Sequence, residues 1–533
     1  MENRLLRTIG VGIVFLCASS CRSREVDDSI NSGSQAMVSI NLLGSDYANA
    51  SDEGQALVSG TSYVSSVGVV DRQSVLLTPS SVIVSELSND SKLEKSASLE
   101  GGGMASVPDA SLGSGVRFRV LVYLQSTGAY QGYQDYTIGQ AGSPIMLSTG
   151  VSYDIVVYSY GSTSALAGIS SSEQANFSSA SINYNNTNRD LMYQHLVYTP
   201  TSSTGNSLNI TLRHKVARIT TVVNAIGVGN LTSVSSGNLT PHYSNGVLSF
   251  SSGSISGRTS STSGSSLTFT SSGSTTQSAG AVFLNADTAG ALLGGFSANM
   301  TIAGTTKAVS MPNRFKVTPA TKSTLNIKMV KCGAYIGSNG SPENFREFMC
   351  HNIGATTSAD PFTPSQVIHG DKFQWGAQIG DSGSYYTQTE DQANSGALAG
   401  WNPSGMPADS WLDATKTSKD PCPTGYRVPT SSQWQAVINN NTVERVGTWS
   451  QGSYTSALYF KNPSNVRTLM LPTTGLRVYN TNGTLNNRGV LGFYWTSTES
   501  SPNAWMMTFS NTLAFTSTSF RPNGMSVRCI SEN

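Results

Sequence analysis

The chain has 533 residues, a formal net charge of +1 at pH 7 and only 12% charged residues. This near-neutral balance argues against nucleic acid or an anionic membrane surface as the partner. The 52 glycines, with serine, threonine and asparagine between short apolar runs, favour an all-β protein with many turns over a helical one. The length is enough for three or four domains.

The first 21 residues have the character of an export signal. An apolar run over residues 9–18 follows two arginines. It is shorter than the roughly 20 residues that a membrane-spanning helix needs, and it fits a secretory signal. Small residues precede Cys21 as in a bacterial lipoprotein box, although Ala18 stands where that motif prefers leucine. We expect residues 1–21 to be a lipoprotein signal peptide and Cys21 to be lipidated; the alternative is an ordinary cleaved signal with an incidental cysteine.

Short strands are predicted along the chain that follows. Residues 36–44 (AMVSINLLG) and residues 116–122 carry an apolar side chain at every second position, which is typical of half-buried strands. Residues 151–160 are apolar on both faces, which predicts a central strand of a sandwich.

The segment SLNITLRHKVARITTVVN alternates and then changes phase near Ala217, which predicts a β-bulge. His214 falls on the inward side of this strand, and we expect a hydrogen-bonded core histidine rather than a ligand or a catalytic base. Between about residues 235 and 277 the chain is mostly serine, glycine and threonine, which favours short strands joined by flexible turns.

Three phrases occur in a fixed order within residues 36–330: RFRVLVYLQSTGAYQGYQDYTIGQAGSPIMLSTGVSYDIVVYSYGS, RDLMYQ and LNITLRHKVARI. In these phrases the chain resembles the fimbrillin-like family of type V pili. The resemblance implies export as a lipoprotein and two tandem transthyretin-like β-sandwich domains, at residues 22–205 and 206–330. In pilins of that family an arginine-specific protease removes the first strand at the cell surface, and the C-terminal strand of the next subunit fills the groove.

The resemblance assigns residues 36–44 as the strand that is removed. Its loss would leave unpaired backbone groups and an apolar slot, which a strand from a neighbouring subunit can fill by β-augmentation. Arg72 is the only arginine between Glu25 and Val116, and it precedes the expected strand QSVLLTP. The resemblance therefore implies proteolytic processing at Arg72 and other pilin subunits as partners. The alternative is a surface-loop arginine that no protease cleaves.

The composition of the chain changes near residue 330. All seven tryptophans lie beyond this point, and so do all the cysteines that follow Cys21. An even number of cysteines in an exported protein indicates disulfides, and four allow three connectivities. The four are Cys332, Cys350, Cys422 and Cys529. We expect a separate domain at residues 331–533.

This last region carries the phrases DPCPTGYRVPTSSQWQAV, LPTTGLR, GFYWTSTES, NAWMMTFS and GMSVRCI, in that order. In them the chain resembles the major-paralogous bacterial family of C-type-lectin-like domains, which is related in fold to formylglycine-generating enzymes. The resemblance implies an α+β domain in which Cys422 pairs with Cys529 and Cys332 with Cys350. A helix is expected to begin just after Pro429, capped by a threonine or serine.

No motif of this region indicates catalysis. The run GDSG at residues 380–383 is similar to the nucleophile loop of trypsin-like proteases, but that activity also needs a positioned histidine and a buried aspartate. Such a run is also ordinary turn chemistry. The calcium-binding triplets of sugar-reading lectins are absent, and no clustered histidines and cysteines indicate another metal. We expect no enzyme, no cofactor and no metal site.

Aromatic residues in a long Gly- and Ser-rich stretch of this region are candidates for ligand recognition, because loops on a rigid scaffold often carry such residues. They are Trp375, Tyr385, Tyr386, Trp401 and Trp411. Burial in a core is the alternative, and the sequence decides neither this nor the ligand, which could be a glycan or a protein.

The expected function is that of a structural and adhesive pilus subunit. Only four residues follow Cys529, fewer than a donor strand needs. We expect a subunit that accepts a strand but donates none, first as an outer-membrane lipoprotein on the surface of a Gram-negative bacterium and then at the pilus tip. The alternative is a non-polymerising surface lipoprotein that binds a glycan or protein ligand.

Overall fold

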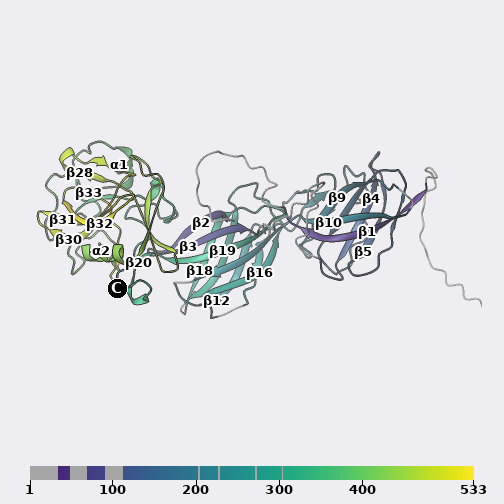
Figure 1. Ribbon diagram of the computed structural model, residues 1–533, viewed down its shortest axis with the longest axis horizontal. Helices are drawn as coiled ribbons and strands as arrows, with labels where there is room; N and C mark the ends of the chain where they lie inside the picture. Colours follow the sequence, from purple (N-terminus) through teal and green to yellow (C-terminus); the bar gives the residue numbers. More distant parts are fainter. Residues whose placement is uncertain are drawn as a thin grey trace, which may run out of the picture.

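The computed structural model describes residues 34–48, 69–90, 112–201, 204–225, 228–270, 273–302 and 304–532. The predicted lipidation site, Cys21, lies outside these residues. The described chain is mainly β, as the sequence predicts, and forms three lobes in a row (Figure 1). Among the described residues, no helix has both the length and the apolar character needed to cross a membrane.

The first lobe, on the right of Figure 1, is built on a seven-stranded sheet with the order β5-β4-β7-β9-β10-β1-β6. Its strands are β1 (Gln35–Asp46), β4 (Arg117–Leu124), β5 (Tyr130–Thr137), β6 (Ile145–Ser148), β7 (Tyr153–Ser159), β9 (Met192–Tyr198) and β10 (Asn206–His214). A small sheet of order β14-β13-β8 covers one face of it. Its strands are β8 (Ser181–Asn183), β13 (Val247–Ser249) and β14 (Ile255–Ser256).

Both faces of the large sheet are buried, and the sequence of β4 shows why. Phe118, Val120 and Val122 point into one apolar core, while Leu121 and Tyr123 point into the other. Strand β7 is buried along its whole length between β4 and β9, so the prediction of a central strand is confirmed.

The second lobe is a sandwich of two facing sheets with the orders β16-β11-β19-β3-β2 and β15-β12-β17-β18. Its strands are β2 (Val69–Thr78), β3 (Ser81–Asn89), β11 (Ala217–Asn224), β12 (Leu231–Thr240), β15 (Ser265–Leu267), β16 (Thr276–Leu284), β17 (Gly294–Ile302), β18 (Thr305–Phe315) and β19 (Lys322–Lys331). Alternate residues of both sheets meet in one core, where Leu325 and Ile327 of β19 lie with Phe296 of β17 and Met311 of β18.

The strands are divided between the first two lobes differently from the prediction, which places the domain boundary after residue 205. Strand β10 lies beside β1 and β9 in the first lobe, although the sequence predicts residues from 206 onward in the second sandwich. Strands β2 and β3 lie in the second lobe, although the sequence predicts them in the first. Alternation identifies a strand but not its partner, and β3 pairs with β19 across 234 residues, as between Asn89 and Ser323.

The phase change near Ala217 is a crossover between lobes and not the predicted bulge. Strand β10 ends at His214 in the first lobe, and β11 begins at Ala217 in the second. Lys215 and Val216 connect them. A switch of sheet and a bulge both shift the apolar phase by one residue, so the sequence pattern is the same for either.

The third lobe combines short sheets with two α-helices. Its strands are β20 (Gly333–Tyr335), β21 (Phe345–Glu347), β22 (Lys372–Gln374), β23 (Tyr385–Tyr386), β24 (Tyr426–Arg427), β25 (Thr442–Val446), β26 (Ala457–Lys461), β27 (Arg467–Pro472), β28 (Leu476–Val478), β29 (Thr484–Asn486), β30 (Gly492–Ser500), β31 (Asn503–Phe509), β32 (Ala514–Phe520), β33 (Gly524–Met525) and β34 (Ile530–Ser531). Its helices are α1 (Gln388–Ala393), α2 (Ser431–Asn440) and the short 3-10 helices η1 (Pro342–Asn344), η2 (Gln366–Ile368) and η3 (Tyr479–Thr481). Thr430 caps α2 in a capping box with Gln433, so the predicted helix start is confirmed.

The turn between β2 and β3 joins the second lobe to the third. The carbonyl of Pro79 in this turn accepts a hydrogen bond of 2.7 Å from the backbone N–H of Cys350. Val84 of β3 packs in the same apolar cluster as Phe362 and Tyr459 of the third lobe. The second and third lobes therefore share a continuous core at their junction.

Candidate functional site

Strand β1 fills a slot in the sheet of the first lobe. It pairs parallel with β10 and antiparallel with β6. Ala36 and Val38 are buried, Ile40 and Leu42 pack against the same core, and the residues between them are exposed. This is the alternation that the sequence predicts. Because both edges of β1 are paired, its loss would leave backbone N–H and C=O groups of β10 and β6 unpaired along an apolar slot.

Side chains fix the end of β1 as well. The carboxylate of Asp46 forms an ion pair with Arg213 of β10, with 3.0 Å between Oδ2 and Nη2. The ring of Tyr47 stacks on the imidazole of His214 with 3.9 Å between ring centres. His214 is buried, and its Nδ1 lies 2.5 Å from Oδ1 of Asp190. The prediction of a hydrogen-bonded core histidine is therefore confirmed.

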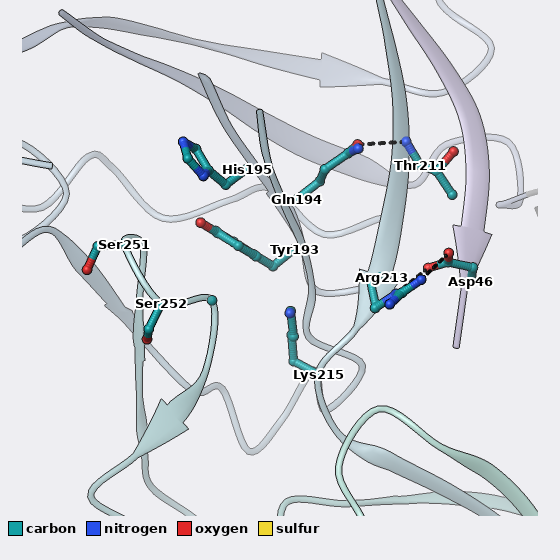
Figure 2. Close-up of a pocket in the computed structure, with 10 residues that line it drawn as sticks. Asp46, Tyr193, Gln194, His195, Thr211, Arg213, Lys215, Ser251 and Ser252 are labelled. Carbon is teal, nitrogen blue, oxygen red and sulfur yellow. Dashed lines mark hydrogen bonds and ion pairs between the residues drawn. The ribbon is translucent and has the colours of Figure 1, made fainter. Parts of the chain in front are cut away.

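A cavity of about 330 Å³ opens beside this end of β1 (Figure 2). Its lining comes from the ends of β1, β9 and β10 and from the turn after β13: Asp46, Tyr193, Gln194, His195, Thr211, Arg213, Lys215, Ser251, Ser252 and Gly253. The ammonium of Lys215 lies 5.2 Å from the centre of the Tyr193 ring. Burial and the nearby Arg213 lower the pKa of Lys215.

Arg72 lies inside β2, whereas the sequence predicts it in a loop before that strand. Its guanidinium contacts Glu86 of β3 at 3.2 Å and Asp360 of the third lobe. Strand β2 is at the edge of its sheet, where charged side chains are common because they oppose aggregation. The segment VVDRQ therefore has the polar composition of a loop although it forms part of an edge strand. A protease would have to displace this strand to reach the peptide bond after Arg72, and processing there stays a prediction.

The four cysteines of the third lobe form two disulfides. Cys332 is bonded to Cys350, and Cys422 to Cys529, which is the pairing that the lectin-like resemblance implies. The second bridge ties the loop before α2 to the last strands of the lobe, where β34 pairs with β24. Ile530, which follows Cys529, is fully buried. The chain near Cys529 is therefore part of a folded core.

The aromatic residues that the sequence singles out for recognition belong mainly to the core. Trp375 and Trp411 are fully buried, and Tyr386 and Trp401 are more than nine-tenths buried. The indole N–H of Trp375 donates to the carbonyl of Thr496 at 2.9 Å. These four side chains are therefore not an exposed binding surface, whereas the fifth, Tyr385, is partly exposed.

The run at residues 380–383 forms a turn. The carboxylate of Asp381 binds the ammonium of Lys419 at 2.9 Å and accepts a hydrogen bond from the backbone N–H of Gln378. Within the described ranges, no group of three or more metal-ligating side chains is placed to hold an ion.

A buried charged network in the third lobe has no signal in the sequence pattern. Asp391 of α1 is buried between Arg477 and Arg488, and Arg477 also donates to the carbonyl of Gly483 at 2.8 Å. These residues lie in separate elements and follow no recognisable spacing. The network braces α1 against β28, and the two arginines share the single carboxylate of Asp391.

The comparisons with known proteins include one match to a family model, over a short segment of the chain. A family model described as "Domain of unknown function (DUF8237)" matches residues 455–530. No curated protein matches the chain.

Several solved structures resemble parts of the fold. A "putative cell adhesion protein" from Bacteroides uniformis is 15% identical over 40% of this chain and 86% of its own, with a TM-score of 0.29. The fimbrial anchor protein Mfa2 from Porphyromonas gingivalis is 12% identical over 43% of this chain and 91% of its own, with a TM-score of 0.27. A "putative cell adhesion protein" from Bacteroides ovatus is 12% identical over 57% of this chain and 97% of its own, with a TM-score of 0.27. Similarity at this level assigns no function to the chain.

Proposed function

We propose that the chain is a structural and adhesive subunit of a type V pilus on the surface of a Gram-negative bacterium. The observation that carries the proposal is the position of β1, whose two edges pair with β10 and β6 and whose apolar side chains enter the core of the first lobe. A strand in this position can be exchanged for a strand of another subunit, because the pairing uses backbone groups and a few apolar contacts.

In this proposal the third lobe is a lectin-like binding domain at the distal tip of the pilus. It lies at the opposite end of the row from the first lobe (Figure 1). The core shared through Val84, Phe362 and Tyr459 makes it a rigid extension of the second lobe. The lobe acts by binding and not by catalysis, and the molecule reaches the surface as a lipoprotein modified at Cys21.

A second function is favoured by the contacts of Arg72. Its ion pairs with Glu86 and Asp360 hold β2 against both neighbours. If these contacts block the protease, β1 stays in place and the chain remains a surface lipoprotein that binds a ligand without polymerising.

Arginine-specific proteolysis of residues 22–533, followed by N-terminal sequencing, separates the two functions. The pilus proposal expects a new N-terminus at Gln73 and loss of β1. The variant Arg72→Lys should resist this cut, whereas Arg346→Lys, a control in β21 of the third lobe, should not. Immunogold labelling of pili with an antibody to residues 331–533 then tests position. Label at one end of the pili supports the tip position, and label along the shaft contradicts it. Label on the cell surface and not on pili, from protein that retains β1, favours the second function.

A further inference from the structure

A second cavity, of about 400 Å³, opens on the first lobe at the end of β7. Its lining comes from the loop after β7, from β8 and from the asparagine-rich loop after β8, and it includes no residue of β1. The volume lies within the roughly 300–1,000 Å³ of small-molecule sites. We propose that this tyrosine–asparagine cavity, defined by Tyr158, Tyr160, Asn183, Tyr184 and Asn188, binds a neutral sugar unit of a glycan.

One wall of the cavity is apolar. Tyr158 and Tyr160 meet edge to face with 5.8 Å between ring centres, and Ile182 and Leu166 continue the surface. The hydroxyl of Tyr160 donates to the carbonyl of Asn183 at 2.8 Å, which fixes its ring against β8. A fixed aromatic wall of this kind favours the C–H face of a sugar ring, because it buries apolar area without losing side-chain entropy.

The charged side chain in the lining of the cavity is already engaged by other residues of the lobe. Glu173 is the charged residue among its lining, and it is buried. Its Oε1 accepts hydrogen bonds from Tyr158 at 2.6 Å and Arg119 at 3.0 Å, and its Oε2 accepts from the hydroxyl of Ser170 at 2.7 Å. Burial alone would raise the pKa of Glu173, but the hydrogen bonds from Tyr158, Ser170 and Arg119 lower it. The carboxylate is thus ionised, and its oxygens are engaged by Tyr158, Arg119 and Ser170, while Arg119 also pairs with Asp135. The carboxylate therefore repels an anion, and a cation finds its oxygens already occupied by these donors.

The asparagines divide into two with structural contacts and two with unengaged amides. Oδ1 of Asn185 accepts the backbone N–H of Asn188 at 3.0 Å, and Oδ1 of Asn186 lies 2.8 Å from Nε2 of His242. The amide groups of Asn183 and Asn188 have no hydrogen bond to another described residue. An amide can donate and accept at once, which matches a sugar hydroxyl. These two amides come from different elements and border the same cavity.

Tyr184 gives an independent sign of a missing partner. It lines the cavity, is only 6% exposed, and its buried hydroxyl has no hydrogen-bond partner in the described part of the chain. Buried hydroxyls are nearly always satisfied. We infer that the wall around this hydroxyl, which is closed to solvent in the free protein, opens slightly on binding so that a ligand hydroxyl or a ligand-bound water satisfies it. Together, an aromatic wall, unengaged amides, an unpaired hydroxyl and a carboxylate that is already engaged define a site for a neutral polyhydroxylated ligand.

The test uses the whole protein, residues 22–533, and saturation-transfer NMR. The probes are the methyl glycosides of glucose, galactose, mannose and N-acetylglucosamine, with glucuronic acid and glucosamine as charged counterparts. We expect saturation of at least one neutral glycoside at about 10 mM, a concentration that reveals Kd values near or below that level. The corresponding charged sugars should receive none.

Three variants locate the site. Asn183→Ala and Asn188→Ala should each weaken binding about tenfold, the value of one good hydrogen bond. Asn439→Ala, which removes an exposed amide on α2 of the third lobe, is the matched control and should bind as the unmodified protein does. Tyr184→Phe should weaken binding without lowering Tm, because it removes a hydroxyl that has no partner in the free protein.

Two outcomes overturn the proposal. One is that no neutral glycoside receives saturation, or that only charged sugars do. The other is that neutral glycosides bind but the Asn183 and Asn188 variants bind unchanged, which would place the site on another surface. The test is independent of β1 release, so a protein that never polymerises can still pass it.

Discussion

The carboxylate of Asp391 is enclosed by two arginines in the third lobe. Its Oδ1 lies 2.7 Å from Nε of Arg477, and Arg488 contacts its other oxygen. Asp391→Ala would leave two buried guanidiniums without a counter-charge, and we expect a loss of about 3–5 kcal/mol in the free energy of unfolding. Urea unfolding measures it. Asp409→Ala, at an exposed position, should change this free energy by less than about 0.5 kcal/mol; equal effects of the two variants would show that the network is not stabilising.

Three buried histidines make the stability depend on pH. Burial, aided by nearby positive charge, lowers the pKa of His242 and of His351 to about 4 and that of His369 well below its usual value. They stay neutral in the folded state but take up protons in the unfolded state below about pH 6.5. Stability should therefore be complete above that pH and fall as the pH drops toward 4, by about 2 kcal/mol per histidine at about pH 5. Urea midpoints that are equal at about pH 7.5 and 5 would refute this.

At the scale of elements, the two disulfides close loops of different length. Cys422 and Cys529 are 107 residues apart, and Cys332 and Cys350 only 18. The chain-entropy model predicts a loss of about 5 kcal/mol when the longer loop is opened and about 3 kcal/mol for the shorter one. Paired Cys→Ser variants, compared by chemical unfolding, give the two values. A larger loss for the Cys332–Cys350 pair would mean that local packing and not loop closure dominates.

The sequence predicts the elements better than their partners. Apolar alternation locates β1 and β7, and the threonine after Pro429 locates the start of α2, because these signals lie within one segment. The exchange of β2, β3 and β10 between lobes has no such local signal, since pairing is decided by residues far away.

The same limit applies to the candidate sites. The run INYNNTN has the composition of a polar loop, and the structure shows that it borders a cavity. The sequence does not show that its two unengaged amides border one cavity, because that cavity forms only when the fold brings β7 and β8 together. The reverse holds for Trp375 and Trp411, whose loop context favours exposure while the fold buries them.

At the scale of the whole molecule, the junction of the second and third lobes should transmit stability between them. Val84→Ala removes apolar contact with Phe362 and Tyr459, and we expect a loss of about 2 kcal/mol. All seven tryptophans lie after residue 330, so tryptophan fluorescence reports on the third lobe alone. The fluorescence transition should shift although Val84 belongs to the second lobe. Val120→Ala in the first lobe is the control and should leave that transition in place; a shift in neither variant would show that the lobes unfold independently.

The interleaving of strands between the first two lobes also sets an order of assembly. Strand β3 cannot complete its sheet until β19 has been made, and the pair Asn89 and Ser323 is separated by 234 residues. At roughly 5–20 residues per second, synthesis alone imposes a wait of about 12–47 s. During it β3 lacks its partner β19, while the large sheet of the first lobe can form as soon as β10 is complete. An emerging chain thus carries a paired sheet in the first lobe and a β2–β3 hairpin without its partner strand, and only folding that begins after the whole chain is released avoids this state.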